Sequence, residues 1–327
     1  MLRSAASFAR KATTPGFANA IEFSLNGKRV TLKEGEFDPL QMMTAYLRSD
    51  KVNLKGTKVG CGEGGCGACT IVVSSTDPIT GEVKHRPVNS CLMPLAQAHH
   101  TSITTVEALG SLREGLHPVQ VSLAEHHGTQ CGFCSPGIAM NAYAMFLDNP
   151  NPTAAQIDEQ MDGNLCRCTG YRSIIDALRK FSSDAKPCDD VIASPVDCKV
   201  KPHEAPKLLE YENNAPVHIT HNGHEVYIPN TLQELIDIKR KHTDAMIIVG
   251  SSEIGIDLRN KGPTSKVYIS AAHIPELINI ELKKDALEFG PSTPLQDILK
   301  FAEHHEATLT PSKRRLLSAI RNRLRYF

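Results

Sequence analysis

The sequence lacks an excess of charge of either sign, since 36 Lys and Arg residues balance 36 Asp and Glu residues. This balance gives no indication of binding to nucleic acid or to a membrane surface. Long apolar runs are also missing: the stretch 245–249 is one of the longest, whereas a membrane span needs about 20 apolar residues. For a chain of 327 residues, we therefore expect a soluble protein of two or three domains.

A secretory signal is also missing from the N-terminus. The first 20 residues include Arg3, Arg10 and Lys11, and no acidic residue precedes Glu22. This composition is typical of a mitochondrial transit peptide, but a disordered cytosolic tail would have a similar composition. We leave residues 1–19 out of the fold prediction as a targeting segment or a tail.

Cysteine, in contrast, is abundant, with ten residues in the chain. Eight of them form two tight sets between Cys61 and Cys168, separated by segments of ordinary core composition. In an intracellular protein such clustering indicates metal binding in a reducing compartment rather than disulfides. Cys188 and Cys198 lie apart from both sets, and we expect them to be free surface thiols.

Local patterns predict a small α+β domain at residues 20–107. Alternating apolar residues around Asn26 and Gly27 predict a β-hairpin. Asp38 followed by Pro39 predicts the start of a helix. A glycine-rich loop at residues 60–68 and further strands to about residue 106 complete the domain.

In the next segments, the apolar residues recur at a different spacing. Residues 108–184 predict four short helices, one of which begins with a capping box of Thr153 and Gln156, and hence a small bundle. Residues 185–216 contain five prolines and predict an extended linker. In residues 217–327, strands alternate with helices, as in an α/β domain.

The first cysteine set has the spacing by which plant-type ferredoxins hold a [2Fe–2S] cluster. Three of its thiolates must converge on a small cluster, so the loop GCGEGGCGAC (60–69) must curl around that cluster. The glycines of the loop permit positive φ and a close approach of the backbone to the cluster. Zinc is the alternative ligand, but zinc does not need a loop so rich in glycine. The set consists of Cys61, Cys66, Cys69 and Cys91.

The second cysteine set consists of Cys131, Cys134, Cys166 and Cys168. Its spacing alone is compatible with zinc as well as with an iron–sulfur cluster. Cys134 directly precedes a predicted helix start, and Cys168 shortly precedes another. The partial positive charge of helix N-termini favours an anionic cluster at this place.

The segments QCGFCSPG (130–137) and GNLCRCTGYR (163–172) resemble the helical iron–sulfur domain of the xanthine dehydrogenase and aldehyde oxidase family. That family also begins with a plant-type ferredoxin domain bearing GCGEGGCGAC. The resemblance implies that all eight cysteines are iron ligands of two [2Fe–2S] clusters. It further implies a multidomain α+β protein with a β-grasp ferredoxin domain, a four-helix [2Fe–2S]-binding domain and a partial α/β FAD-binding domain.

Residues 247–255 resemble the start of the family's FAD domain, where a strand runs into a Gly-Asn-Thr-Glu-Ile-Gly loop against the FAD pyrophosphate. Taken alone, this segment could be an ordinary turn between a strand and a helix. Ser251 and Ser252 stand where Asn and Thr are usual, and both offer N–H and hydroxyl donors to phosphate. The resemblance implies a partial FAD site formed by Ile247, Ile248, Val249, Gly250, Ser251, Ser252, Glu253 and Ile254.

The resemblance also implies a function. In the family, electrons pass from substrate at molybdenum through the helical-domain cluster and the plant-type cluster to FAD, and then to NAD or oxygen. The chain would be the electron-transfer portion of a xanthine dehydrogenase-like molybdo-flavoenzyme. We expect no catalytic residue and no hydroxylase activity in this chain alone, because molybdopterin would lie in a missing domain or a partner, and residues 217–327 resemble a truncated FAD-binding domain.

Two other interpretations stay open at this point. The chain could be a separate iron–sulfur and flavin subunit or an aldehyde oxidase-like protein, or it could be an inactive truncated remnant. The implied partner is a molybdenum-containing domain or subunit, and full-length members of the family form homodimers. The family implies a cytoplasmic location, with the mitochondrion as the alternative from residues 1–20.

Overall fold

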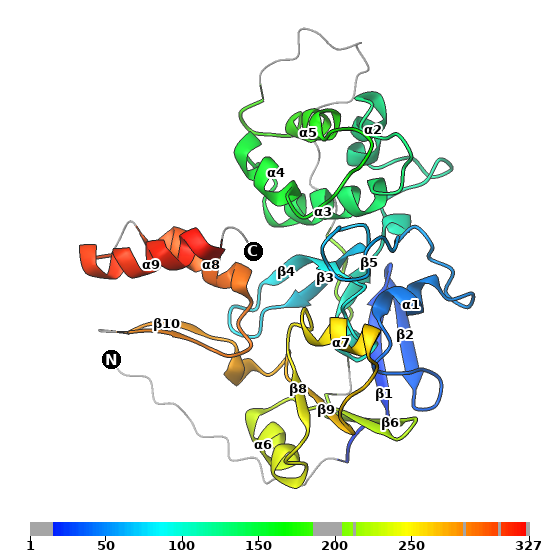
Figure 1. The fold of residues 1–327 in the computed structure, drawn as a ribbon, viewed down its shortest axis with the longest axis vertical. Helices are drawn as coiled ribbons and strands as arrows, with labels where there is room; N and C mark the ends of the chain where they lie inside the picture. Colours follow the sequence, from blue (N-terminus) through cyan, green and yellow to red (C-terminus); the bar gives the residue numbers. More distant parts are fainter. Residues whose placement is uncertain (1–15, 186–204, 212–213, 284–285, 307–308, 325–327) are drawn as a thin grey trace.

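The computed structural model describes residues 16–185, 205–211, 214–283, 286–306 and 309–324. Cys188 and Cys198 lie outside the described residues, as does most of the predicted targeting segment. Figure 1 shows a sheet with a group of helices on one side of it and a second sheet with its own helices on the other. Among the described helices, none combines the length and the apolar character that a membrane crossing requires.

The first sheet contains, within the described residues, five strands in the order β2-β1-β5-β3-β4. β1 and β5 are parallel and the other neighbours are antiparallel, so the sheet is mixed. Asn26 and Gly27 both have positive φ and form the turn of the predicted hairpin, which is confirmed. The strands are β1 (Ala20–Leu25), β2 (Lys28–Lys33), β3 (Thr70–Thr76), β4 (Val83–Asn89) and β5 (Ser102–Thr104).

The helix predicted at Asp38 begins later than expected. The Asp38 carboxylate accepts a hydrogen bond of 2.9 Å from the N–H of Leu40. This local turn competes with a helix start, and helix α1 (Met43–Arg48) begins only after it. Met43 of α1 then packs into the core beside the first sheet. Two 3₁₀ helices follow later, η1 (Leu95–Ala98) and η2 (Val106–Ala108).

Four helices form the second part of the chain within the described residues 16–185, as the sequence predicted. They are α2 (Pro118–Glu125), α3 (Ser135–Asp148), α4 (Ala154–Met161) and α5 (Arg172–Arg179). The capping box of Thr153 and Gln156 is present at the start of α4. Met140 of α3 packs against Val72 of β3, so α3 is the helix that joins this group to the first sheet.

The third part alternates strands and helices, as predicted. Four of its described strands form a sheet in the order β6-β7-β9-β8, in which β7 and β8 lie parallel to β9. No pattern in the sequence predicted β6. The elements are β6 (Val217–His221), β7 (His224–Ile228), α6 (Leu232–Lys241), β8 (Met246–Ile248), α7 (Ile254–Asn260), β9 (Val267–Ser270), η3 (Pro275–Leu277), β10 (Ile280–Leu282), β11 (Leu287–Phe289), α8 (Leu295–His305) and α9 (Pro311–Leu324).

The first and third parts share one hydrophobic core. Phe23 of β1 belongs to the same cluster of buried side chains as Ile219 of β6 and Ile248 of β8. Ala18, which precedes β1, also pairs in parallel with Val217. The last residues of the predicted tail therefore take part in the fold.

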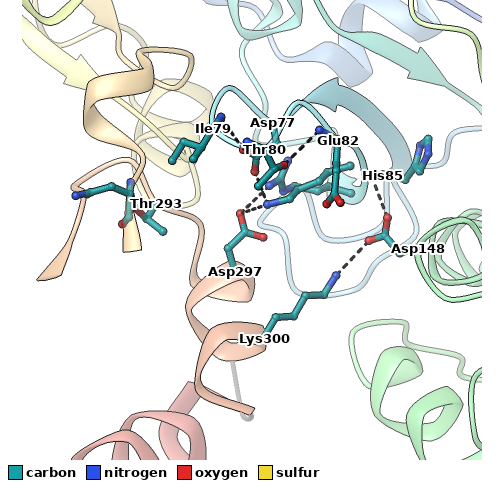
Figure 2. Close-up of polar contacts among 12 residues, drawn as sticks. Asp77, Ile79, Thr80, Glu82, His85, Asp148, Thr293, Asp297 and Lys300 are labelled. Atoms are coloured by element: carbon teal, nitrogen blue, oxygen red, sulfur yellow. Dashed lines mark hydrogen bonds and ion pairs between the residues drawn. The ribbon is translucent and has the colours of Figure 1, made fainter. Parts of the chain in front are cut away.

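Helix α8 is attached to the first sheet by ion pairs, which Figure 2 shows. Asp297 in the first turn of α8 pairs with Lys84 at 3.3 Å and with Arg86 at 2.8 Å, both on β4. Lys300, one turn later, pairs with Asp148 at the end of α3 at 3.4 Å. These contacts place α8 beside both the first sheet and the helical part.

Candidate functional site

The first cysteine set lies on two segments of the first part. Three of its thiols come from the loop between α1 and β3, and Cys91 comes from the segment just after β4. Cys69 and Cys91 are 2% and 0% exposed, whereas Cys61 is exposed. The fold thus brings all four members of this predicted set into one region, with its inner side buried and its outer side open to solvent.

Backbone amides of the loop point at the sulfur atoms. The N–H of Glu63 donates to Sγ of Cys61 at 3.3 Å, and the N–H of Cys61 donates to Sγ of Cys66 at 3.4 Å. Gly62 and Gly64 both have φ of 76°, which lets the chain turn its amides inward. Donors in these positions stabilise negative charge on sulfur.

The four thiols of this set are arranged as two hydrogen-bonded pairs, Cys61 with Cys66 and Cys69 with Cys91. The hydrogen bond between Cys69 and Cys91 raises the pKa of Cys69 and lowers the pKa of Cys91 to about 6. Burial raises the pKa of Cys61, but hydrogen bonds from backbone amides, that of Glu63 first, outweigh it and lower the pKa. In each pair, hydrogen bonding therefore favours negative charge on one thiol, Cys61 or Cys91.

The second cysteine set lies at the N-terminal end of α3 and between α4 and α5. Cys134 is the N-cap residue of α3, as the sequence predicted. Cys166 is 5% exposed, whereas Cys131 and Cys168 are exposed. This site therefore also has a buried side and a side that faces solvent.

The thiols of the second set again form two pairs, Cys131 with Cys168 and Cys134 with Cys166. Burial raises the pKa of Cys134 to about 12. Burial acts in the same direction on Cys166, but hydrogen bonds from Thr169 outweigh it and lower the pKa of Cys166 to about 7. The Thr169 hydroxyl donates to this sulfur at 3.2 Å and its N–H at 3.5 Å.

The two cysteine sites adjoin each other. The N–H of Leu165, the residue before Cys166, donates to the carbonyl oxygen of Cys66 at 3.0 Å. The Asn164 side chain donates to the carbonyl oxygen of Gly67 at 3.1 Å. No sequence motif identified Asn164 as a contact between the sites, because its partner lies in a different part of the chain.

The predicted FAD loop joins β8 to α7, and its residues differ in what they face. The Ile248 side chain is buried in the shared core, and Ile247 is 44% exposed. Gly250, Ser252 and Glu253 are exposed. Ser251 is 5% exposed and has φ of 62°. The loop thus presents open backbone to solvent.

Gln97 of η1, which no sequence pattern indicated, holds this loop from the first part of the chain. Its side-chain amide donates to the carbonyl oxygen of Val249 at 2.6 Å and accepts from the Ser251 hydroxyl at 2.8 Å. We expected that hydroxyl to be a phosphate donor, but it is directed to Gln97 instead. Only the exposed Ser252 hydroxyl remains for that role among the two serines.

No arrangement for a single metal ion is present among the described residues: no group of three or more His, Cys, Asp or Glu side chains is placed to hold one. This finding includes both cysteine sets, because all eight thiols lie within the described residues. In each set the thiols form the two hydrogen-bonded pairs described above.

Three family models match the chain. They are a "2Fe-2S iron-sulfur cluster binding domain" at residues 25–96, a "[2Fe-2S] binding domain" at residues 105–179, and a "FAD binding domain in molybdopterin dehydrogenase" at residues 220–323. These matches define the class of protein: it contains two domains for [2Fe–2S] clusters and a flavin domain.

Similar proteins narrow this class to one family. The chain is 36% identical over 338 residues to xanthine dehydrogenase/oxidase of Rattus norvegicus, covering 95% of this chain and 25% of that protein. It is 36% identical over 315 residues to aldehyde oxidase 1 of Macaca fascicularis, covering 86% of this chain and 23% of that protein. The chain therefore belongs to the xanthine dehydrogenase and aldehyde oxidase family, and it spans about a quarter of the length of these relatives.

Solved structures include a similar chain as well. Quinoline 2-oxidoreductase from Pseudomonas putida 86 is 40% identical, and the match covers 49% of this chain and 90% of that chain with a TM-score of 0.42.

Proposed function

We propose that this chain is the electron-transfer portion of a xanthine dehydrogenase-like oxidoreductase that contains molybdenum and flavin. The observation that carries this proposal is the direct contact between the two four-cysteine sites at Leu165 and Cys66. When bound, [2Fe–2S] clusters supply one-electron carriers, and FAD supplies a carrier that exchanges electrons with NAD or oxygen. The chain's own residues hold these groups, set their spacing and limit the access of water.

The pairing of the thiols supports iron–sulfur clusters over zinc. A [2Fe–2S] cluster takes two cysteine ligands on each of its two irons, which fits two contacting pairs in each set. Structural zinc needs four ligands in a tetrahedron around one ion, and it does not need a loop as rich in glycine as residues 60–69. The proposed iron ligands are Cys61, Cys66, Cys69 and Cys91 for one cluster, and Cys131, Cys134, Cys166 and Cys168 for the other.

A short backbone route supports electron transfer between the sites. Cys166 is covalently bonded to Leu165, and the N–H of Leu165 is hydrogen-bonded to the carbonyl oxygen of Cys66. A proposed ligand of one site is thus connected to a proposed ligand of the other by one peptide unit and one hydrogen bond. On the opposite side, Ile256 of α7 packs against Cys69 and Cys91 and connects the first site to the flavin loop.

The finer fold assignments belong to the same proposal. A mixed five-stranded sheet with α1 in its core supports a β-grasp ferredoxin domain at residues 20–107. Helices α2 to α5 support a four-helix domain at residues 108–184. We further propose a linker at 185–216 and a FAD-binding domain at 217–327.

We also propose that the loop at residues 247–254 contacts FAD. A Cβ added at Gly250 would meet no atom within 4 Å, so its backbone is open to the approach of a pyrophosphate. Ser252 is exposed beside it. The buried Ile248 and Ser251 would act by shaping the loop rather than by touching the cofactor.

The exposed side of the second site supports docking of a molybdenum domain or subunit. Cys131 and Cys168 are exposed there. They lie in the two segments that also expose the apolar residues Phe133, Leu165 and Tyr171, at 46%, 44% and 41%. Exposed apolar residues around a redox site are typical of an interface. The homodimer and the cytoplasmic location remain predictions from the family.

Metal and sulfide analysis of anaerobically purified protein tests this function. We expect about four irons and about four acid-labile sulfides per chain, with the visible absorption of [2Fe–2S] clusters. Stoichiometric zinc without visible absorption would contradict the proposal. Flavin content measured on the same sample tests the FAD site separately.

A further inference from the structure

Helix α7 docks directly on the first cysteine site. A Cβ added at Gly255 would lie 2.4 Å from the carbonyl oxygen of Leu92, so only glycine allows this approach of the helix. The next residue, Ile256, packs against Cys69 and Cys91. The helix that follows the flavin loop therefore lies against the buried half of the site.

Arg259 extends this contact to the exposed half of the site. It lies one turn after Gly255, on the same face of α7. A Cβ added at Gly62 would lie 2.4 Å from Cζ, 2.5 Å from Nη2 and 2.7 Å from Nε of Arg259. The guanidinium therefore rests on the backbone between Cys61 and Glu63, at the bend where the loop directs an N–H at a sulfur.

The charge of Arg259 is available to the loop. Among the described residues, no carboxylate forms an ion pair with it, whereas Lys261, two residues later, pairs with Asp257 at 2.9 Å. The positive charge of Arg259 therefore lies at the loop that carries Cys61.

We propose that Arg259 is a positioning residue that raises the reduction potential of the plant-type cluster from within the flavin-binding segment. This inference rests on the proposed function, because it requires a [2Fe–2S] cluster at this site. Reduction adds one negative charge to a cluster, and a nearby cation favours the more negative state. The potential of this site then depends on the docking of α7, so the flavin segment itself makes the cluster a better electron acceptor.

The experiment is an EPR-monitored redox titration of the anaerobically purified full chain. Arg259→Gln removes the charge, and Arg259→Lys keeps it. Lys261→Gln is the matched control. It removes a positive charge two residues after Arg259, where that charge belongs to an exposed ion pair with Asp257. We expect the midpoint potential of the plant-type cluster to become more negative in Arg259→Gln, to stay closer to the parent in Arg259→Lys, and to be unchanged in Lys261→Gln.

Further readouts separate the inference from its alternatives. Because Arg259 is exposed, added salt is expected to move the parent potential toward that of Arg259→Gln, while the second cluster keeps its potential in every variant.

Equal potentials in Arg259→Gln and Lys261→Gln would overturn the inference, and so would an equal shift of both clusters. If Arg259→Gln assembles no plant-type cluster, recovery in Arg259→Lys supports a role for the charge, and loss in both variants contradicts it. If the parent chain holds four irons but Arg259→Gln does not shift the midpoint potential, only the role of Arg259 is refuted. A parent chain without iron refutes the proposed function.

Discussion

The N–H of Leu165 donates a hydrogen bond to the carbonyl oxygen of Cys66 across 3.0 Å. Leu165 precedes a cysteine of the second site, and Cys66 belongs to the first. The two sites are therefore fixed relative to each other by main-chain atoms, which do not depend on side-chain rotamers. Such a contact suits a protein in which electrons must pass repeatedly over the same short distance.

Gly137 is expected to be essential for the packing between the two sites. A Cβ added there would lie 2.1 Å from the carbonyl oxygen of Gly67, and backbone atoms of the cluster loop cannot move away easily. Gly137→Ala should therefore lower the free energy of unfolding by about 1–3 kcal/mol. Urea denaturation measures the change. Gly163→Ala is the control, because its methyl group would meet no atom within 4 Å, and an equal loss in both variants would refute the explanation.

The two cysteine sites are expected to bind their clusters independently. Cys61→Ser should remove one EPR signal and about half of the iron, because the second set keeps its four thiols. Cys131→Ser should remove the other signal and leave the first. Iron analysis and EPR spectra of reduced samples decide this. Loss of both signals in either variant would show that the two sites assemble only together.

Asp297 is expected to hold α8 on the first sheet. Its side chain is 13% exposed and pairs with both Lys84 and Arg86. Asp297→Asn should weaken this attachment by about 1 kcal/mol, which corresponds to a roughly fivefold faster cleavage of α8 in limited proteolysis. The control Asp257→Asn breaks only an exposed pair within one helix and should change the rate little. Equal rates in the two variants would exclude the proposed anchor.

Buried His99 is expected to make the protein less stable in mild acid. Burial lowers its pKa to about 3, and the nearby His100 and His273 act in the same direction. The folded state keeps His99 neutral, while the unfolded state takes up a proton below about pH 6.5. Because the unfolded state binds more protons, the free energy of unfolding falls as the pH decreases from about 6.5 toward about 3.

His99→Gln tests this pH dependence. The glutamine can still accept the hydrogen bond that the N–H of Glu22 donates to the His99 ring at 3.1 Å, but it does not titrate. Between about pH 7.5 and about pH 5.5, the parent should lose about 1.4 kcal/mol more stability than the variant. Urea midpoints at both pH values give the comparison. The same pH dependence in both proteins would rule His99 out as its cause.

Local patterns in the sequence predicted much of the fold. The hairpin at Asn26 and Gly27, the capping box at Thr153 and the helix start after Cys134 are all present. Each depends on residues within a few positions of one another, so short-range physics is sufficient. The predicted start of α1 was wrong because the Asp38 carboxylate accepts a hydrogen bond from a nearby N–H and forms a turn. The sequence pattern of such a turn is the same as that of a helix cap.

The sequence by itself determined the two cysteine sets and the glycine-rich loop, because ligand spacing and positive φ are properties of neighbouring residues. Only the tertiary structure decided that Gln97 meets Ser251 and that Arg259 meets Gly62. These contacts join parts of the chain that are distant in sequence. They exist because apolar residues such as Phe23 and Ile219 are buried together in one core, and no local pattern specifies which buried faces pack against each other.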